Sequence, residues 1–362
     1  KVEIMRALAR DARVIVMDEP TSALTADEAA KLHRLIAWLR DEGRTVIYVT
    51  HFLEAVLEHC DRVTVMRDGH VVRTGPTAAE TKGTLVEAML GRTLATTFPE
   101  RPPRPALSVQ PLLRLTDVHS GSAVRGVTLQ VRPGEIVGLA GLVGSGRSEI
   151  ARVVFGADPL DGGELAIGDR SLTRTSPRRS VREDVALIPE DRRAQGLVLE
   201  RSVEENITLP HLHRFARAGV LSRRRERKAA AGLVEQLNVQ PPRLDHEVGV
   251  FSGGNQQKVL FAKWMLGQPK VVVLDEPTRG VDIGNKQRIY ELIGDLARSG
   301  AAVLLISSEL EEVLELSHRV YLVRDGQVVD EVDPAATTVD GVLFQLFQVA
   351  GATPPSDPGE SR

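Results

Sequence analysis

A glycine-rich stretch just ahead of a serine is the clearest chemical signal in this sequence. Residues 141–148 read Gly-Leu-Val-Gly-Ser-Gly-Arg-Ser, and they lie between an apolar run at 136–140 and a helical pattern. Glycines at this spacing let backbone N–H groups turn around phosphate oxygens, and the start of the next helix adds positive potential. The spacing therefore predicts a phosphate-binding loop, with contacts from Gly141, Gly144, Ser145, Gly146, Arg147 and Ser148.

Two residues of this loop bear directly on its chemistry. The hydroxyl of Ser148 stands where the motif places a ligand for Mg²⁺. Arg147 stands where the motif has lysine. Arginine keeps the positive charge, but its guanidinium is bulkier and forked, so we do not expect the exchange to be neutral in a tight site.

Paired carboxylates follow two further apolar runs. Asp18 and Glu19 end one run, and Asp275 and Glu276 end the other. At a strand end in nucleotide hydrolases, the first carboxylate can hold Mg²⁺ through water, and the second can polarise the attacking water. We therefore predict Asp18 and Asp275 as metal-site residues, and Glu19 and Glu276 as catalytic residues.

A Ser-Gly-Gly turn precedes another helical pattern. Residues 251–258 read Phe-Ser-Gly-Gly-Asn-Gln-Gln-Lys. Small residues allow close approach of the backbone, and the start of a helix can bind a phosphate, although the same pattern is also typical of a plain helix cap. The nucleotide contacts predicted here are Ser252, Gly253, Gly254 and Gln256.

The chain also repeats itself. Residues 14–21, Val-Ile-Val-Met-Asp-Glu-Pro-Thr, recur as residues 271–278, Val-Val-Val-Leu-Asp-Glu-Pro-Thr, at an offset of 257 (271 − 14). Other residues match at the same offset, so residues 1 to about 90 copy residues 258 to about 347. If both copies have one architecture, about 150 residues of the first copy precede Lys1, and we expect that copy to be truncated.

Pattern and composition predict the organisation of the chain. Apolar, β-branched runs predict buried parallel strands at 14–17, 46–49, 136–140, 271–274 and 303–306. Helical patterns such as Asp27–Arg40 and Asn285–Arg298 alternate with them, which predicts an α/β fold with a largely parallel sheet. We expect a partial first copy at 1–92, a proline-rich linker at 93–110, a complete second copy at 111–350 and a disordered tail at 351–362.

The composition narrows the class of protein. The chain has 362 residues, which is enough for roughly two domains. Cys60 is the single cysteine, which excludes an internal disulfide and a cysteine-based zinc site and favours a reducing cytosol. The net charge is −3 with Lys and Arg spread along the chain, which argues against nucleic acid as the main partner. The apolar runs are far shorter than the ~18 residues of a membrane span.

Together, these motifs resemble the ATP-binding-cassette (ABC) proteins. The second copy carries GLVGSGRS, FSGGNQQK, VVVLDEPTRGVD and ISSEL, and the first carries VIVMDEPTSALT and YVTH. The doubled glutamine, PEDRR at 189–193 and PTRGVD are similar in particular to tandem two-cassette subunits of bacterial monosaccharide importers. The resemblance implies ATP and Mg²⁺ as ligands. It also implies a P-loop NTPase fold with a mainly parallel core sheet, an antiparallel β subdomain and an α-helical subdomain.

The resemblance further implies two nucleotide sites. Each combines the phosphate loop of one cassette with the Ser-Gly-Gly signature of another, within one chain or between chains. In the first copy, it makes Glu19 the general base and His51 a contact to the γ-phosphate. In the second copy, Ser308 stands at the position of that histidine, and Glu190 replaces the glutamine that senses Mg²⁺. With Arg147 as a third departure, we expect one hydrolytic site and one degenerate site.

The same resemblance implies partners and a location. Asp282 is expected to couple the two sites, and Asp191 and Arg192 are expected to lie where a membrane subunit docks. The implied partners are membrane permease subunits and an extracytoplasmic sugar-binding protein, with no nucleic acid. The protein would be peripheral on the cytoplasmic face of the cell membrane. Without its first phosphate loop, the hydrolytic site of this chain is expected to be incomplete.

Three other interpretations share part of the pattern. Importers of nucleosides or of autoinducer-type signals carry overlapping motifs. A soluble tandem cassette protein of translation would have a long, basic, helical linker, whereas residues 93–110 are few and proline-rich; one of DNA repair would insert cysteine-rich zinc modules, which the single cysteine excludes. A nonfunctional fragment would change the competence of the chain and not its family. We therefore favour the ATPase subunit of a sugar importer.

Overall fold

The structure is a computed structural model that describes residues 12–18, 20–21, 26–50, 52–67, 69–90, 98–172, 174–217 and 219–348. The chain divides into two compact units. The first unit comprises residues 1–97 and 282–286, and the second comprises residues 98–281 and 287–362. Each is described by itself. Among the described residues, no helix is both long and apolar enough to cross a bilayer.

A six-stranded sheet forms the core of the second unit, in the order β10-β13-β14-β7-β15-β16. The strands pair in parallel from β10 to β15, and β16 is antiparallel to β15. Every residue of β7, β13 and β14 is buried, which explains their continuous apolar sequences. The strands are β7 (Ile136–Ala140), β10 (Val185–Ile188), β13 (Val271–Asp275), β14 (Ala302–Ile306), β15 (Arg319–Arg324) and β16 (Gln327–Val332).

Helices follow these strands and pack on the sheet. Helix α5 contacts β13 and β10, and α11 contacts β7 and β15. These connections have the alternating strand–helix order that the sequence predicts, and the predicted strands and the α10 helix are confirmed. The helices are α5 (Arg147–Phe155), α6 (Pro177–Arg182), α10 (Ile283–Arg298), α11 (Leu310–Leu316) and α12 (Val339–Gln348), with the short turn η6 (Pro334–Ala336) before α12.

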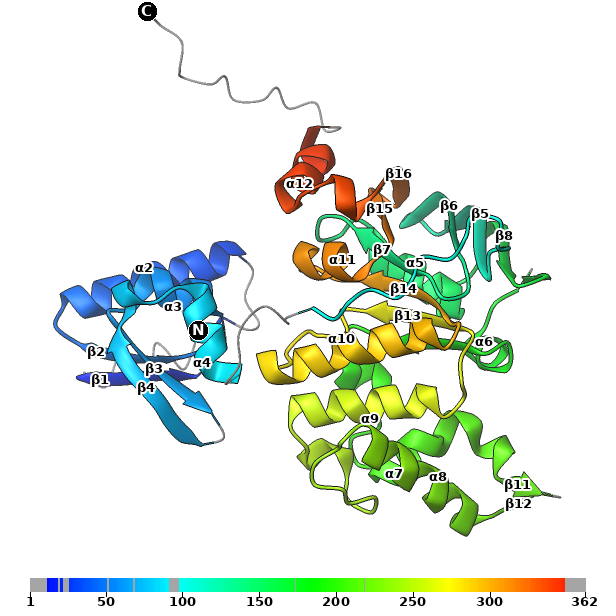
Figure 1. Cartoon of the computed structure of the whole chain (residues 1–362), viewed down its shortest axis with the longest axis horizontal. Coiled ribbons are helices and arrows are strands. Elements are labelled where there is room, and N and C mark those ends of the chain that lie inside the picture. Colours follow the sequence, from blue (N-terminus) through cyan, green and yellow to red (C-terminus); the bar gives the residue numbers. More distant parts are fainter. Residues whose placement is uncertain are drawn as a thin grey trace, which may run out of the picture. The chain divides into compact units, whose positions relative to one another are not determined.

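Two smaller layers complete the second unit. One is an antiparallel sheet in the order β6-β5-β8-β9, and the other is a helical layer of α7, α8 and α9. Figure 1 shows the helical layer on one side of the core sheet and β5, β6 and β8 on another. The predicted antiparallel and helical subdomains are thus confirmed. Their elements are β5 (Leu113–Ser120), β6 (Val124–Val131), β8 (Gly162–Ile167), β9 (Arg170–Leu172), η3 (Arg192–Gly196), α7 (Val203–Thr208), η4 (Leu209–Arg214), β11 (Ala216–Arg217), β12 (Val220–Leu221), α8 (Arg223–Gln236), η5 (Val248–Val250) and α9 (Gly253–Met265).

Residues 98–110, which the proline content predicts as a linker, pack against the second unit. The ring of Phe98 stacks on Tyr290 with 5.0 Å between centroids. Arg101 donates from Nη1 to the carbonyl oxygen of Ser317 at 2.9 Å. Proline fixes φ and removes N–H donors, so a proline-rich segment can lie extended on a surface without leaving buried donors unpaired. The second unit therefore begins earlier in the chain than composition predicts.

The first unit repeats the order of elements that ends the second. Its strands β1 and β2 pair in parallel, and β3 and β4 pair antiparallel. Every element begins 257 residues before one of the same type in the second unit, from β1 at 14 and β13 at 271 to α4 at 82 and α12 at 339. The elements are β1 (Val14–Asp18), α2 (Ala26–Asp41), β2 (Thr45–Val49), α3 (Leu53–His59), β3 (Arg62–Arg67), β4 (His70–Pro76), η1 (Thr77–Ala79) and α4 (Lys82–Leu90).

One strand distinguishes the sheets of the two units. In the second unit, β7 lies between β14 and β15 and joins them into one sheet. In the described part of the first unit, the equivalent strands β2 and β3 belong to separate sheets, and both line one pocket. Val16 and Ile47 are 64% and 48% exposed there, whereas the equivalent Val273 and Leu304 are each 0% exposed. These two apolar side chains of the first unit are therefore far more exposed than their equivalents in the second unit.

Candidate nucleotide-binding site

The predicted phosphate loop connects β7 to α5, so it leaves the sheet at a strand end and enters a helix N-terminus. Its glycines are required by the backbone. A Cβ on Gly141 would lie 2.3 Å from the carbonyl oxygen of Val323, and Gly146 has φ +101°. Gly144 has φ +81° and open space around it. The Oγ atom of Ser145 is buried and has no hydrogen-bond partner in the structure. The loop therefore has the shape and the free polar groups of an anion cradle.

Ser148 and Asp275 meet at the end of this loop. Ser148 donates from Oγ to Oδ1 of Asp275 at 3.1 Å. Asp275 is only 4% exposed, and its burial raises the pKa of the carboxyl to about 6 against the opposing hydrogen bond from Ser148. A hydroxyl and a carboxylate side by side are hard oxygen donors of the kind that Mg²⁺ prefers. The structure thus brings together the two metal-site residues predicted from the loop and from β13.

Arg147 points into the protein. It is 8% exposed, and Nη1 donates to the carbonyl oxygen of Ser307 at 2.8 Å. Burial lowers the pKa of Arg147, while the nearby carboxylates of Glu276 and Asp275 oppose that shift. The positive charge of the phosphate loop therefore lies between the end of β14 and the two acidic residues.

Glu276 holds a strained position next to Asp275. Its φ is +50°, which is rare for a residue other than glycine. Ser308 donates from Oγ to Oε2 of Glu276 at 3.0 Å, and burial raises the pKa of this carboxyl. Backbone strain of this kind clusters at functional sites. The residue that replaces the expected histidine therefore contacts the predicted catalytic carboxylate directly.

The predicted signature turn begins α9. Ser252 is the N-cap residue and is exposed, and its Oγ accepts a hydrogen bond from Nδ2 of Asn255 at 3.1 Å. Gln256 is 4% exposed, and its Nε2 donates to the carbonyl oxygens of Val248 and Phe251 at 3.3 and 3.0 Å. Its amide nitrogen thus holds the turn ahead of the helix. A nucleotide contact from Gln256 stays a prediction.

The segment after β10 carries the predicted Mg²⁺ sensor and docking residues. Glu190 forms an ion pair with Arg279, so its carboxylate faces the loop after β13. Asp191 caps η3 by accepting two backbone N–H groups at 3.0 Å each, and Asp282 accepts a backbone N–H of α10 at 3.0 Å. Arg192 donates from Nη1 to the carbonyl oxygen of Arg279 at 2.8 Å. The metal role of Glu190 and the coupling roles of the others stay predictions.

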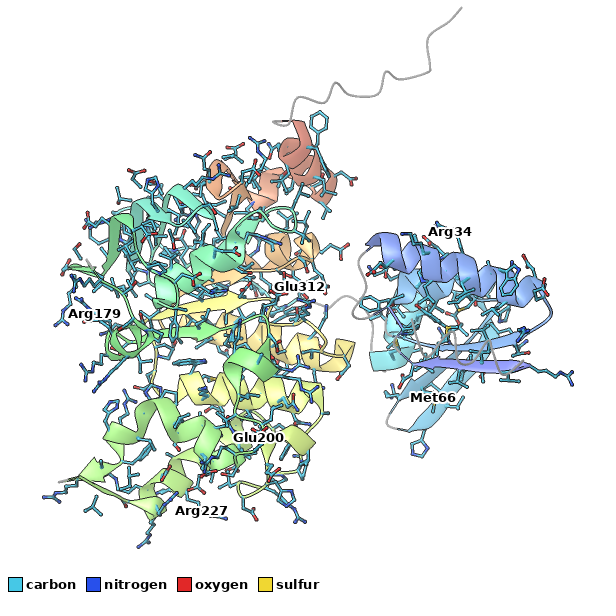
Figure 2. The ribbon with its side chains drawn as sticks, turned by 180° about the vertical axis from the view of Figure 1, so that it is seen from behind. Arg34, Met66, Arg179, Glu200, Arg227 and Glu312 are labelled. Atoms are coloured by element: carbon cyan, nitrogen blue, oxygen red, sulfur yellow. The ribbon has the colours of Figure 1, made fainter. Side chains whose placement is uncertain are left out.

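A buried carboxylate behind the site was missed by sequence reasoning. Glu312 is 1% exposed and belongs to α11 of the second unit (Figure 2). It accepts hydrogen bonds from Thr278 Oγ1 at 2.8 Å, Tyr290 Oη at 2.6 Å and Ser307 Oγ at 2.9 Å. Since Ser307 also accepts from Arg147, the network runs from the phosphate loop to the loop after β13. An acidic residue on a helix gives no sequence signal of burial, because its partners lie in other elements.

In the first unit, Asp18 is exposed at the end of β1. Glu19 and His51 lie outside the described residues, so their catalytic roles stay predictions.

The oxygen donors at the phosphate loop fit Mg²⁺ together with a nucleotide. In the parts of the chain that the structure describes, no group of three or more His, Cys, Asp or Glu side chains could hold a metal. Mg²⁺ in phosphate-transfer sites keeps several waters and is held by one or two protein ligands plus phosphate oxygens. Ser148 and Asp275 match that small share of protein ligands, and their metal role stays a prediction.

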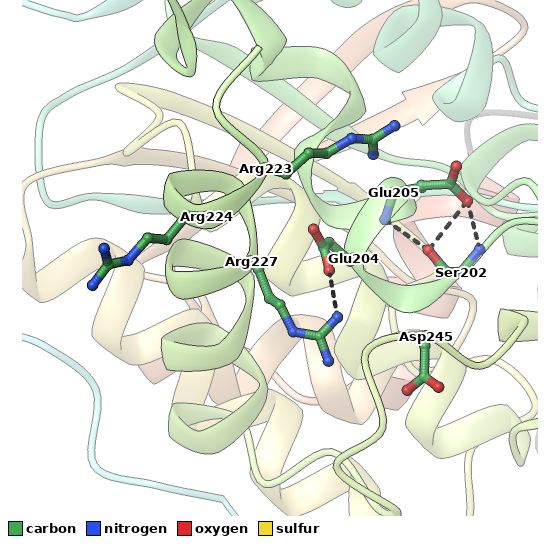
Figure 3. A pocket seen from close by; sticks show the side chains of 7 residues that line it. All are labelled: Ser202, Glu204, Glu205, Arg223, Arg224, Arg227 and Asp245. Atoms are coloured by element: carbon green, nitrogen blue, oxygen red, sulfur yellow. Dashed lines mark hydrogen bonds and ion pairs between the residues drawn. The ribbon is translucent and has the colours of Figure 1, made fainter.

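A charged pocket lies on the helical layer, and the residues that line it are distant in sequence from the phosphate loop. It is lined by residues of α7 and α8 and by Asp245. Arg227 and Glu204 point toward one another at 3.4 Å, and Ser202 and Glu205 form a capping box at the start of α7 (Figure 3). Arg224 is exposed on the same helix. The paired charges of this pocket indicate a solvated helix face, and so does the arginine run at the start of α8.

Comparisons with known proteins agree with this geometry. Residues 124–279 match the family model described as ABC transporter. The chain is 43% identical over 343 residues to the ribose import ATP-binding protein RbsA of Rhodococcus jostii, covering 95% of this chain and 68% of the relative. It is 44% identical over 350 residues to ribose import ATP-binding protein RbsA 2 of Rubrobacter xylanophilus, covering 97% of this chain and 67% of the relative.

Solved structures show the same fold. A nucleotide-free ATP-binding cassette from an ABC transporter superposes with a TM-score of 0.54 at 23% identity, covering 62% of this chain and 92% of that one. The ATP-binding cassette MJ0796, in a dimeric post-hydrolysis state bound to ADP and Pi, gives a TM-score of 0.53 at 21% identity, covering 61% and 98%. At these identities, the likeness concerns the fold alone.

Proposed function

The chain belongs to the import ATP-binding proteins of the ABC transporter family, and on that premise we propose that it couples ATP hydrolysis to the uptake of a simple sugar. The substrate class follows the relatives, whose names specify ribose import. The chain spans about two thirds of the length of these relatives, 68% and 67%. The proposal for a complete transporter subunit therefore extends beyond the residues present here.

The pairing of Ser148 with Asp275 carries the nucleotide part of the proposal. The two residues are 127 positions apart, yet their oxygens lie 3.1 Å apart beside an open glycine loop. In a nucleotide-bound site, Ser148 and Asp275 would hold Mg²⁺, and the N–H groups of the loop and of the α5 N-terminus would bind phosphate oxygens. Bound Mg²⁺ neutralises charge on the phosphates during transfer. Glu276 is placed to orient a water beside that site.

We infer that the two nucleotide sites differ in turnover. At the second-unit site, Arg147 replaces lysine and bonds to the protein, and Ser308 rather than histidine contacts Glu276. Ser308 is a small neutral group and cannot hold a positive charge near a γ-phosphate. The first copy keeps Glu19 and His51 in the equivalent sequence positions. We therefore propose hydrolysis at the site that combines the first copy with Ser252, Gly253 and Gly254, and slow turnover at the other.

The first unit is proposed to be the C-terminal part of the first of two cassettes, and the second unit to be the second cassette. Its elements keep the spacing of β13 to α12, and β2 and β3 leave room where β7 lies in the second unit. The family premise supports pairing of cassettes, permease subunits and a sugar-binding protein as partners, and a peripheral position on the cytoplasmic face of the membrane. Asp191 and Asp282 are both exposed, which suits contacts of this kind.

Nucleotide binding by the purified chain tests the proposal. Titration of MgATP by calorimetry should show binding that depends on Mg²⁺ and is lost in Asp275→Asn. Glu311→Gln, on the exposed side of α11, is a matched control and should bind as the wild type does. Failure of the wild-type chain to bind MgATP would overturn the proposed function.

Turnover tests the assignment of the two sites. In a protein completed with its first phosphate loop, Glu19→Gln should abolish steady-state ATP hydrolysis, and Glu276→Gln should reduce it much less. Equal losses would contradict the proposed asymmetry.

A further inference from the structure

We propose that Arg192 is a positioning residue that clamps the signature turn, residues 252–254, to the loop after β13. Through this contact, nucleotide bound at the second-unit site acts on the signature turn, which we assign to the other nucleotide site. The PEDRR segment is expected to lie where a membrane subunit docks, and that expectation stays a prediction. Within the chain, the Arg192 guanidinium contacts the loop after β13 and lies beside Gly253. The inference rests on the proposed function only in naming a nucleotide as the input.

The contacts of Arg192 span elements far apart in the sequence. Nη1 donates to the carbonyl oxygen of Arg279 at 2.8 Å, and Nη2 donates to that of Gly280 at 3.4 Å. Both carbonyls belong to the loop between β13 and α10. Its Nε is buried and has no hydrogen-bond partner in the structure. Two donors of one rigid guanidinium fix a loop more firmly than a single flexible ammonium can.

Gly253 forms the other side of the clamp. A Cβ at this position would lie 2.6 Å from Nη2 of Arg192 and 3.1 Å from the carbonyl oxygen of Gly280. The guanidinium therefore occupies the space that any side chain at residue 253 would need. Gly253 is the first residue of α9, directly after Ser252. Gly253 thus has a second physical role, because the absence of a side chain there leaves space for the Arg192 guanidinium.

The segment that carries Arg192 is itself fixed to α9. A Cβ on Gly196, at the end of η3, would lie 3.0 Å from Leu260, and Lys263 donates from Nζ to the carbonyl oxygen of Gly196 at 2.7 Å. At its start, Glu190 pairs with Arg279. The segment therefore joins a carboxylate at the predicted Mg²⁺-sensing position to the helix that begins with the signature.

These contacts define a route between the two sites. Movement of the loop after β13, which leaves directly from Asp275 and Glu276, shifts the two carbonyls that hold Arg192. Because the guanidinium also lies against Gly253, we expect the signature turn to move with it. Arg193 supplies a matched comparison: its side chain is exposed and forms no hydrogen bond or ion pair with the described residues, while its backbone N–H bonds to Asp191.

A double-mutant cycle in the nucleotide-free chain tests the clamp itself. Gly253→Ala should increase the unfolding constant by roughly 10-fold in the wild-type background, and by clearly less in Arg192→Ala, where the clash is removed. Arg193→Ala should leave the cost of Gly253→Ala unchanged. Equal costs of Gly253→Ala with and without Arg192 would overturn the clamp, whatever the chain does with nucleotide.

Hydrogen exchange tests the transmission. On addition of MgATP, amide exchange at residues 252–258 should slow in the wild type and in Arg193→Ala. In Arg192→Ala and Arg192→Lys, the chain should still bind MgATP by calorimetry, but exchange at 252–258 should no longer respond. An undiminished response in both Arg192 variants would overturn the proposal. Absence of MgATP binding to the wild type would count against the proposed function, and the exchange experiment would then have no ligand to respond to. The double-mutant cycle would still show whether Arg192 clamps the signature turn.

Discussion

Nη1 of Arg147 donates a hydrogen bond of 2.8 Å to the carbonyl oxygen of Ser307. The bond joins the phosphate loop to the end of β14. It engages the side chain that would otherwise be available to a phosphate. The predicted departure from the lysine motif is therefore a difference in geometry as well as in residue type.

Arg147→Lys should tighten ATP binding at this site. An ammonium on a flexible stem can reach a phosphate as a compact charge, whereas the forked guanidinium is held by Ser307. We expect the dissociation constant for MgATP to fall several-fold, on the order of 1 kcal/mol. Calorimetric titration measures it, with Arg152→Lys on the exposed side of α5 as the control. Weaker binding by Arg147→Lys would show that the arginine contacts phosphate in the bound state.

Glu312→Gln should destabilise the second unit. Glutamine has one oxygen instead of two and adds donors where Thr278, Tyr290 and Ser307 already donate. Loss of hydrogen bonds to a buried charge predicts a decrease of about 2–4 kcal/mol in the free energy of unfolding. Urea unfolding followed by circular dichroism measures it. The neighbouring Glu311→Gln is on an exposed position and should change the stability by less than about 0.5 kcal/mol. Similar effects of both substitutions would contradict the network.

His211 should make the second unit sensitive to acid. Its burial lowers the pKa from 6.5 to about 4, so the folded protein takes up this proton only at low pH. The unfolded chain takes it up near the ordinary pKa. The contribution of neutral His211 to the free energy of unfolding is therefore present above pH 6.5 and is lost as the pH falls toward 4. Between pH 7.5 and 5, the loss should be about 2 kcal/mol.

His211→Phe removes that titration and keeps an aromatic ring near Trp264, whose centroid is 6.4 Å from that of His211. Its free energy of unfolding should fall less between pH 7.5 and 5 than that of the wild type. An identical acid dependence in the wild type and in His211→Phe would show that His211 does not titrate differently on folding.

Val16 and Val273 occupy equivalent strand positions, but substitution by threonine should affect self-association at Val16 and stability at Val273. Threonine keeps the β-branched shape but adds a hydroxyl. Val16→Thr changes an exposed position and should reduce self-association of the chain, as measured by light scattering. Val273→Thr buries an unpaired hydroxyl and should cost about 1–3 kcal/mol in urea unfolding. Equal stability costs would mean that Val16 is covered in solution.

The sequence was sufficient for the elements and for part of the site. Apolar runs and glycine spacing are local signals, so they predict β7, the phosphate loop, β13 and the meeting of Ser148 with Asp275. Contacts of Glu312 and Arg192 depend on partners far along the chain, and neither residue type signals burial. The docking of Phe98 on Tyr290 was missed for a related reason. Proline content predicts an extended backbone, but it does not distinguish a free linker from a segment that lies on a surface.

The hairpins β3–β4 and β15–β16 share a shift in their strand pairing. Comparing them separates local from tertiary causes of that shift. Pairing shifts between Val65 and Met66 in β3, and between Leu322 and Val323 in β15, which are the same positions of the repeat. Only β15 has β7 beside it. The hairpin thus acquires its bend without help from that neighbour. A strand that paired with β3 would therefore meet an edge whose pairing shift is already present.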